Sequence, residues 1–298
     1  MPYGTIQVVK QDKIGWLILN RPQKLNAIND IMLKEIEDGL EELRSDNNVW
    51  LVIIKGAGKS FSAGQDLSGV GTAAVTPADP RSKAYLSDIF ESGQKLAERW
   101  RSLFSYPRFT IAQVHGYCLG MGAMLAMCCK ALICTEDAVF GDPAVRMGWA
   151  SPNPLWTWRV GIKKTKELLL TGRYIGGKEA EQLGLAMKAV PAYKLDEIVR
   201  EEADAQIRFG GIGGYDMQMA WRIAHETNMD VAGLSSAWRY TSYLYALSSI
   251  QRPGRSFIDR GGIDFCRLRD EKGLKSAIAA RDEPTKKYFP PPPAPKVS

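Results

Sequence analysis

Two glycine-containing segments of this chain are the ones best suited to take part in a chemical reaction. Residues 61–67 read FSAGQDL, and residues 120–122 read GMG. Each is expected to form a turn between a strand and a helix, where backbone N–H groups stay free and the helix N-terminus adds positive potential. Two such turns together can hold a carbonyl oxygen as it becomes an oxyanion. The pair therefore indicates acyl chemistry that needs neither a metal ion nor a nucleophilic triad.

Hydrophobic patterns predict the elements that must position these turns. Strands are expected at residues 6–9, 14–19, 50–56, 110–114, 131–135 and 138–141. A helix should begin at Asn29 with one apolar face, and another should run from about 83 to 104. The apolar stretch 120–134 reads as a buried helix, too short to span a bilayer. The recurring strand–strand–helix order predicts a layered α/β structure.

The flanking regions carry weaker signals. The polar residues 69–81 are expected to form a loop, and the proline-rich end an extended tail. From about Leu195 the pattern becomes mainly helical. Large apolar side chains in that part would pack on its own core or between subunits; they are Trp221, Trp238, Tyr240, Tyr243, Tyr245 and Leu247.

Composition narrows the possible partners and the compartment. The 298 residues carry a formal net charge of +6, but the basic residues are dispersed, which argues against a nucleic-acid partner and suits a small polyphosphate ligand. The five cysteines show neither paired metal spacing nor a secreted framework, so buried free thiols are expected. With no signal-peptide core in residues 1–16, we expect a cytoplasmic protein without a membrane partner.

Four segments in order resemble the crotonase superfamily, also called the enoyl-CoA hydratase/isomerase family. They are residues 20–27 (NRPQKLNA), 61–67, 114–122 (VHGYCLGMG), and 170–173 (LTGR) together with 180–185 (AEQLGL). The resemblance implies a spiral core of strand–strand–helix repeats over residues 1–194 and a helical trimerisation region over 195–289. A flexible tail would follow at 290–298. It also implies trimers or dimers of trimers, with coenzyme A as part of the substrate and no tightly bound cofactor.

The same resemblance assigns roles to individual residues. Backbone N–H groups of Gln65 and Met121 would hold the thioester oxygen. The family usually has glycine where Met121 stands, so the added side chain would either narrow the acyl pocket or disturb the turn. Asp66 is expected to cap the backbone N–H groups that follow it rather than to act as a catalyst. The predicted substrate- and CoA-binding set is Lys24, Leu25 and Ala27 at the CoA entrance, Ser62, Ala63 and Gly64 at the adenine end, and Asp66, Tyr117, Gly120 and Trp149.

Hydratases of this family use two glutamates, and this chain has neither at the expected places. Met124 follows the second turn, and Ala144 follows the Phe-Gly-X-Pro segment. Asp142 is the nearest replacement. In an extended segment it would share a face with Ala144 at a spacing of roughly 6–7 Å. Asp142 would then act as a single acid/base or attack the acyl group; alternatively it forms a turn beside Pro143 or pairs with Arg146.

Other polar and aromatic residues near the turns are expected to have either structural or functional roles. His115 is expected to be a hydrogen-bonded turn residue, and His225 a structural residue on a helix. Tyr117 would either pack or bind substrate. Trp149, Trp156 and Trp158 would either fill a core or form a pocket for a flat acyl group.

The sequence thus predicts a crotonase-like enzyme acting on an acyl-CoA. Hydration, double-bond isomerisation, hydrolysis and carbon–carbon cleavage all stay open. A hydrolase or lyase using Asp142 is the alternative enzyme, and a non-catalytic acyl-CoA-binding protein is the alternative from another class.

Overall fold

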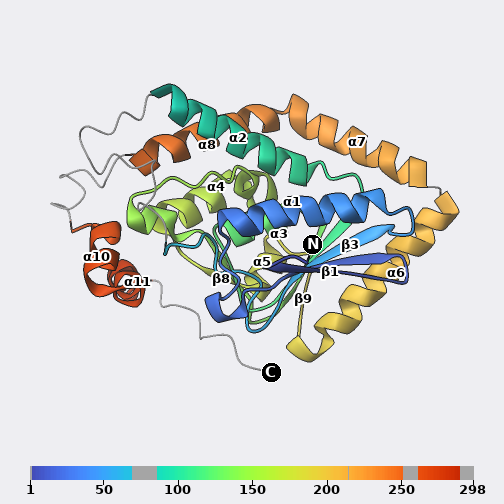
Figure 1. Cartoon of the computed structure of the whole chain (residues 1–298), viewed down its shortest axis with the longest axis horizontal. Helices are drawn as coiled ribbons and strands as arrows, with labels where there is room; N and C mark the ends of the chain where they lie inside the picture. The colour runs from blue at the N-terminus through green and yellow to red at the C-terminus, as the bar shows by residue number, and fades with distance from the viewer. Residues whose placement is uncertain (1, 69–85, 214, 251–260, 289–298) are drawn as a thin grey trace.

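The computed structural model describes residues 2–68, 86–213, 215–250 and 261–288 (Figure 1). The predicted loop at 69–81 and tail at 290–298 lie outside these residues, as do the side chains of Trp221 and Leu247. Two sheets form the centre, and helices pack around them. No described helix is long and apolar enough to cross a membrane.

A six-stranded sheet begins with a hairpin of β1 (Ile6–Gln11) and β2 (Ile14–Leu19). Asp12 and Lys13 make the tight turn with φ of 52° and 69°, the left-handed values that a two-residue hairpin loop requires. The sheet order is β1-β2-β3-β4-β6-β9, and every pairing after the hairpin is parallel. The remaining strands are β3 (Leu51–Gly56), β4 (Phe109–Val114), β6 (Ala131–Thr135) and β9 (Lys188–Val190).

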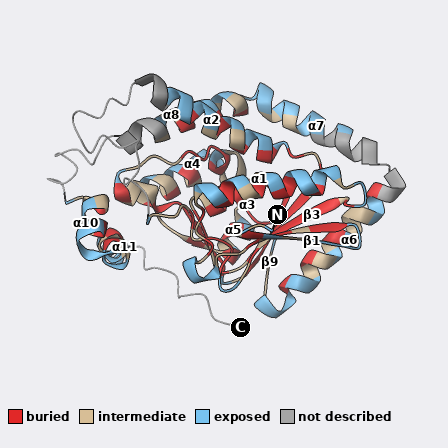
Figure 2. Ribbon diagram, in the orientation of Figure 1, coloured by how far each residue is buried: buried red, intermediate tan, exposed pale blue. Residues whose placement is uncertain are grey.

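Alternating side chains of the central strands bury both faces of this sheet. Val52 and Ile54 of β3 belong to the main core, whereas Leu51 and Ile53 face a second core covered by α6 (Leu195–Gly213). The nearly continuous apolar runs in the sequence reflect this burial on both sides. Figure 2 shows the strands largely buried at the centre of the molecule.

Helix α1 (Asp30–Ser45) forms as its sequence predicts. The Asn29 side chain accepts a hydrogen bond from the Met32 N–H at 3.0 Å and caps the helix. All the apolar residues expected on one face are buried, namely Met32, Leu33, Ile36, Leu40 and Leu43.

A second sheet of three strands, in the order β5-β7-β8, lies next to the glycine turns. It contains β5 (Tyr117–Leu119), β7 (Val139–Gly141) and β8 (Ile175–Gly176). The sequence had not predicted β5 or β8, nor the equally short β9 of the large sheet. These strands span only two or three residues, too few for an alternating pattern to stand out from the flanking turns.

The prediction of one buried helix over residues 120–134 was wrong in its length. Helix α3 (Met121–Cys128) ends where Cys129 becomes extended, and the chain then enters β6. The prediction of buried free thiols is confirmed for Cys118, Cys128, Cys129 and Cys134. Burial raises the pKa of the Cys134 thiol to about 12, which keeps it protonated and unreactive.

The predicted helical character after Leu195 is also confirmed. Beyond α6 come α7 (Tyr215–Val231), α8 (Leu234–Ile250), α10 (Phe265–Lys272) and α11 (Leu274–Asp282). Helix α8 packs along α2 (Leu86–Phe104), as Figure 1 shows. The rings of Phe90 and Tyr243, one from each helix, meet edge to face with their centroids 5.1 Å apart. Shorter elements complete the fold: α4 (Leu155–Thr171), α5 (Gly177–Gln182), and the 3₁₀ turns η1 (Pro22–Lys24), η2 (Pro143–Met147), η3 (Ala192–Lys194) and η4 (Glu283–Thr285).

Candidate functional site

The two glycine turns are bonded to one another through their backbones. The Ser62 N–H donates to the Tyr117 carbonyl at 2.8 Å, and the Leu119 N–H donates to the Ser62 carbonyl at 3.0 Å. Gly64 has a φ of 95°, and a Cβ there would lie 2.7 Å from the Leu119 oxygen; a Cβ on Gly122 would lie 2.7 Å from that of Ser62. Glycine at both places is what allows the turns to approach this closely.

The second turn leads directly into a helix, as predicted. Gly120 is the N-cap of α3, with a φ of 48°. The first turn instead continues as a loop that runs beside Ile28: the Ile28 N–H donates to Gly64, and the Asp66 N–H donates to Ile28. A helix after this first turn stays a prediction, because residues 69–85 lie outside the described part of the chain.

Gln65 of the first turn and Met121 of the second line the same cavity. Neither residue's backbone N–H group has an acceptor among the residues that the structure describes. For Met121 the reason is general, since the first N–H groups of a helix lack an intrahelical partner and carry the positive end of its dipole. The two turns thus present two free donors that local structure leaves unsatisfied.

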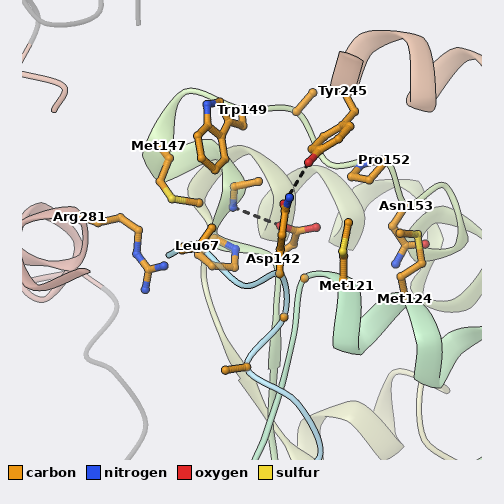
Figure 3. Close-up of a pocket in the computed structure, with 17 residues that line it drawn as sticks. Leu67, Met121, Met124, Asp142, Met147, Trp149, Pro152, Asn153, Tyr245 and Arg281 are labelled. Atoms are coloured by element: carbon orange, nitrogen blue, oxygen red, sulfur yellow. Dashed lines mark hydrogen bonds between the residues drawn. The ribbon is translucent and has the colours of Figure 1, made fainter. Parts of the chain in front are cut away.

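The cavity beside these donors has a volume of about 60 Å³ and a mainly apolar lining (Figure 3). Its wall combines residues from both turns, η2, the loop before α4, α8 and α11. Apolar lining residues include Leu67, Met121, Met124, Pro143, Ala144, Met147, Trp149, Ala150 and Pro152. The polar side chains that reach it are those of Gln65, Asp142, Asn153, Tyr245 and Arg281. An apolar wall with a few convergent polar groups is typical of a small-molecule site.

Asp142 is the carboxylate among the described residues that line this cavity, and it is 5% exposed. Its Oδ2 accepts a hydrogen bond from the Ser151 hydroxyl at 2.5 Å, and its Oδ1 accepts one from the Ala144 N–H at 3.2 Å. It has no cationic partner within the described part of the chain. Burial raises the pKa of Asp142, although the hydrogen bonds from Ser151 and Ala144 oppose the shift.

Asp142 itself is extended, with φ of −134° and ψ of 97°, but the chain does not stay extended as far as Ala144, and the alternative of a turn beside Pro143 is confirmed. Pro143 begins η2, so Asp142 is the N-cap of a 3₁₀ turn and accepts from the N–H two residues ahead. Proline at the first helical position favours this outcome because its φ is preset for a helix. Asp142 and Ala144 still line the same cavity. Arg146 does not pair with Asp142; it pairs with Asp282 of α11 at 3.0 Å.

Residues predicted for the CoA segments lie along the outer side of the first turn. The Ala63 N–H donates to Leu25, and the Ser62 hydroxyl donates to Asn26, which joins the segment of Lys24, Leu25 and Ala27 to this turn. Ala63, Gly64, Gly120 and Trp149 line the cavity itself, whereas Lys24, Leu25, Ala27, Ser62, Asp66 and Tyr117 do not.

Asp66 has the structural role predicted for it. Its Oδ1 accepts from the backbone and side chain of Ser68, and its Oδ2 pairs with Arg21 at 2.9 Å. Burial alone would raise the pKa of Asp66, but the hydrogen bonds from Ser68 and Arg21 outweigh burial and lower it. Asp66 is therefore ionised and fully engaged in holding the turn.

Of the histidines and clustered tryptophans that the structure describes, Trp149 alone lines the cavity. The His115 ring is hydrogen-bonded to the Gly58 carbonyl at 2.8 Å, as expected of a turn residue, and His225 is exposed on α7. Trp149 lines the cavity and meets Phe265 at 6.3 Å, whereas Trp156 is fully buried and Trp158 packs against the main core.

Sequence reasoning missed several residues that complete the site. Tyr245 of α8 was noted only as apolar surface, yet its hydroxyl donates to the Gln65 side chain at 3.0 Å (Figure 3). Ser151, Asn153 and Arg281 were not singled out at all. Tyr245 lies 180 residues from Gln65 and Arg281 still further along the chain, so no local spacing could have revealed them. The polar run before α4 was a usable signal for Ser151.

Comparisons with known proteins show which family this chain resembles. The model of the enoyl-CoA hydratase/isomerase family matches residues 10–208. A probable mitochondrial enoyl-CoA hydratase of Dictyostelium discoideum is 35% identical over 287 residues, covering 95% of this chain and 91% of the relative. A probable enoyl-CoA hydratase of Mycobacterium bovis is 36% identical over 204 residues, covering 67% of this chain and 73% of the relative.

A solved structure extends the similarity to the fold. The enoyl-CoA hydratase/isomerase from Xanthobacter autotrophicus Py2 superposes with a TM-score of 0.80 at 28% identity, covering 95% of this chain and 98% of that one. The expected crotonase-like fold is therefore confirmed.

The buried carboxyl of Asp142 predicts a specific pH dependence of stability. Because folding raises its pKa, the charged form opposes folding: stability falls as pH rises from the ordinary aspartate range, near 3.9, through the pKa of the folded state. Asp142→Asn removes this loss, so the variant should gain stability over wild type across that interval, by about 1.4 kcal/mol per pKa unit. Thermal unfolding at a series of pH values measures the difference.

Asp66→Asn is the matched control with the opposite sign. The lowered pKa of Asp66 contributes stability above the ordinary aspartate range that is lost as pH falls, so this variant should lose stability relative to wild type at neutral pH. Parallel pH profiles for wild type and Asp142→Asn would contradict the assignment of a raised pKa to Asp142.

Proposed function

Because the chain belongs to the enoyl-CoA hydratase/isomerase family, we propose that it binds an acyl-CoA thioester and stabilises negative charge on the thioester oxygen. The observation that carries the proposal is that Gln65 and Met121 line one cavity, come from two turns bonded to each other, and have backbone N–H groups without an acceptor among the described residues. Donors fixed in this way need no reorganisation as charge develops on the oxygen, which is the main source of their catalytic effect.

In this proposal Asp142 is the residue that transfers protons. Met124 and Ala144, which stand where the family's hydratases have glutamates, line the cavity beside it and cannot exchange protons. Burial gives Asp142 a raised pKa, which brings the carboxyl closer to the range in which one group can both donate and accept a proton near neutral pH. The Ser151 hydroxyl holds Oδ2, which leaves the carboxyl in a defined orientation. The reaction is accordingly not the standard two-glutamate hydration.

Two alternatives follow from the same residues. Asp142 beside an oxyanion site also suits an acyl-CoA hydrolase or a carbon–carbon lyase, in which it would activate water or take a proton from the acyl group. The loss of both glutamate positions favours the second alternative, a non-catalytic acyl-CoA-binding protein. A panel of CoA thioesters monitored by mass spectrometry separates these: a new product identifies the reaction, and tight binding without any product identifies the binder.

The first prediction concerns the ligand. At least one CoA thioester should bind more tightly than the corresponding free acid in calorimetry, because only the thioester combines the CoA contacts with the two backbone donors. Crotonyl-CoA should be hydrated very slowly, since Met124 and Ala144 replace the two carboxylates. Equal affinities for acid and thioester across the panel, or rapid crotonyl-CoA hydration, would refute the proposal.

The second prediction concerns the catalyst. Asp142→Asn should retain thioester binding and lower turnover of the true substrate by roughly 10²-fold or more, the scale of general acid–base catalysis. Asp137→Asn, an exposed carboxylate in the turn before β7 that lies outside the cavity, is the control and should keep wild-type turnover. Full activity in Asp142→Asn would remove Asp142 from the mechanism.

The third prediction concerns assembly. Helices α7 and α8 expose large apolar side chains, among them Val231 at 85%, Tyr240 at 69% and Leu244 at 57% exposure, and we infer that this surface joins subunits into a trimer or a multiple of three. Tyr240 and Leu244 lie one turn apart on the same face of α8. Light scattering should show the oligomer for wild type and smaller species for Tyr240→Glu with Leu244→Glu; a wild-type monomer at micromolar concentration would overturn this inference.

A further inference from the structure

Arg281 places a positive charge at the wall of the cavity. It comes from α11, is 9% exposed, and is one of the side chains that line the cavity (Figure 3). In this view it lies beside Met147 and Leu67, across the labelled group from Met121 and Met124. A nearly buried guanidinium in a mainly apolar cavity is costly unless its charge is matched, so its partners decide what it can do.

The local charges do not cancel. Asp282 accepts from Nε and Nη2 of Arg281, both at 2.8 Å, and from Nη1 of Arg146 at 3.0 Å. Two guanidinium groups therefore share one carboxylate, which leaves a net charge of about one positive unit. Nη1 of Arg281 has no hydrogen-bond partner among the residues that the structure describes.

Arg281 is not needed to attach α11 to the rest of the fold. The pair of Arg146 with Asp282 already joins η2 to α11, and Arg146 is anchored further by the Gly172 carbonyl at 2.7 Å. Phe265 and Ala277 pack with Met147 in a small apolar core at the same junction. The second guanidinium thus adds an unmatched donor at the cavity rather than a missing structural contact.

We propose that Arg281 binds a carboxylate at the far end of the acyl chain, so that the substrate class is an acyl-CoA whose acyl group ends in an anion. This inference rests on the proposed function of the cavity as the acyl site. A guanidinium fork is the group best suited to a carboxylate, and Asp282 orients the fork so that Nη1 is available. The free donors of Gln65 and Met121 would hold the thioester end of the same acyl group.

The position of Arg281 favours the acyl group over the phosphates of CoA as the source of the anion. The segment predicted to form the CoA entrance, with Lys24, Leu25 and Ala27, does not line the cavity. Arg281 instead shares the cavity with Asp142, Met147 and Trp149. Because the Arg281 guanidinium lies among the residues around the reacting end of the substrate, it is placed to bind the acyl group.

Matched saturated thioesters test this without depending on turnover. Glutaryl-CoA is butyryl-CoA with one added carboxylate, and pimeloyl-CoA relates to hexanoyl-CoA in the same way. Calorimetry with the full-length wild type should show tighter binding of the carboxylate-bearing member in at least one pair. Arg281→Met should weaken that member by about 10- to 100-fold, the loss expected for a charge-assisted hydrogen bond, while its neutral counterpart changes little.

Two further variants make the result specific. Arg281→Lys keeps the charge but loses the fork, so it should retain part of the preference. Lys275→Met removes a positive charge from an exposed position on the same helix and should leave all four affinities unchanged.

Each remaining outcome overturns the inference. Equal wild-type affinities within both pairs would exclude recognition of the acyl terminus while leaving the proposed function intact. A loss shared equally by neutral and charged thioesters in Arg281→Met would assign Arg281 to the CoA phosphates or to folding. Failure of every thioester to bind the wild type would refute the proposed function and this inference together.

Discussion

The site depends on the backbone contact between the two glycine turns. Each turn has an N–H group without an acceptor in the described part of the chain, but separately neither would define a place for a ligand atom. The hydrogen bonds from Ser62 to Tyr117 and from Leu119 to Ser62 bring the turns together, and the absence of Cβ atoms at Gly64 and Gly122 permits the distance. Because these bonds extend the pairing of short strands anchored in the sheets, the two donors are held by the rigid part of the fold.

The second constraint is the burial of Asp142 without a cation. Arg146 is four residues away in the chain, yet it is drawn to Asp282, so the carboxyl of Asp142 is opposed only by a hydroxyl and a backbone N–H. An ion pair would have held Asp142 ionised, as Arg21 helps to do for Asp66. The two aspartates therefore differ in protonation behaviour because of their neighbours rather than their chemistry, and only Asp142 lines the cavity.

The C-terminal helices complete the cavity that the sheets begin. Tyr245 of α8 holds the Gln65 side chain, and α11 contributes Arg281 together with the pair that secures it. A cavity built from the turns alone would be open on this side. Residues after Leu195 thus supply polar groups to the site as well as apolar surface, which connects the helical region directly to the chemistry.

The sequence by itself determined the features that depend on neighbours along the chain. The turns, the first five strands of the large sheet, the cap at Asn29 and the buried face of α1 follow from local patterns and from glycine's conformational freedom. The family resemblance followed from the order of its motifs. Short strands such as β5 were not predicted from the sequence, because they are too brief to show an alternating hydrophobic pattern. The tertiary structure alone decided that Asp142 caps η2, that Arg146 pairs with a residue 136 positions away, and that Tyr245 and Arg281 reach the cavity. Such contacts join segments that packing brings together, and the spacing of residues along the chain does not predict which distant residue a side chain will contact.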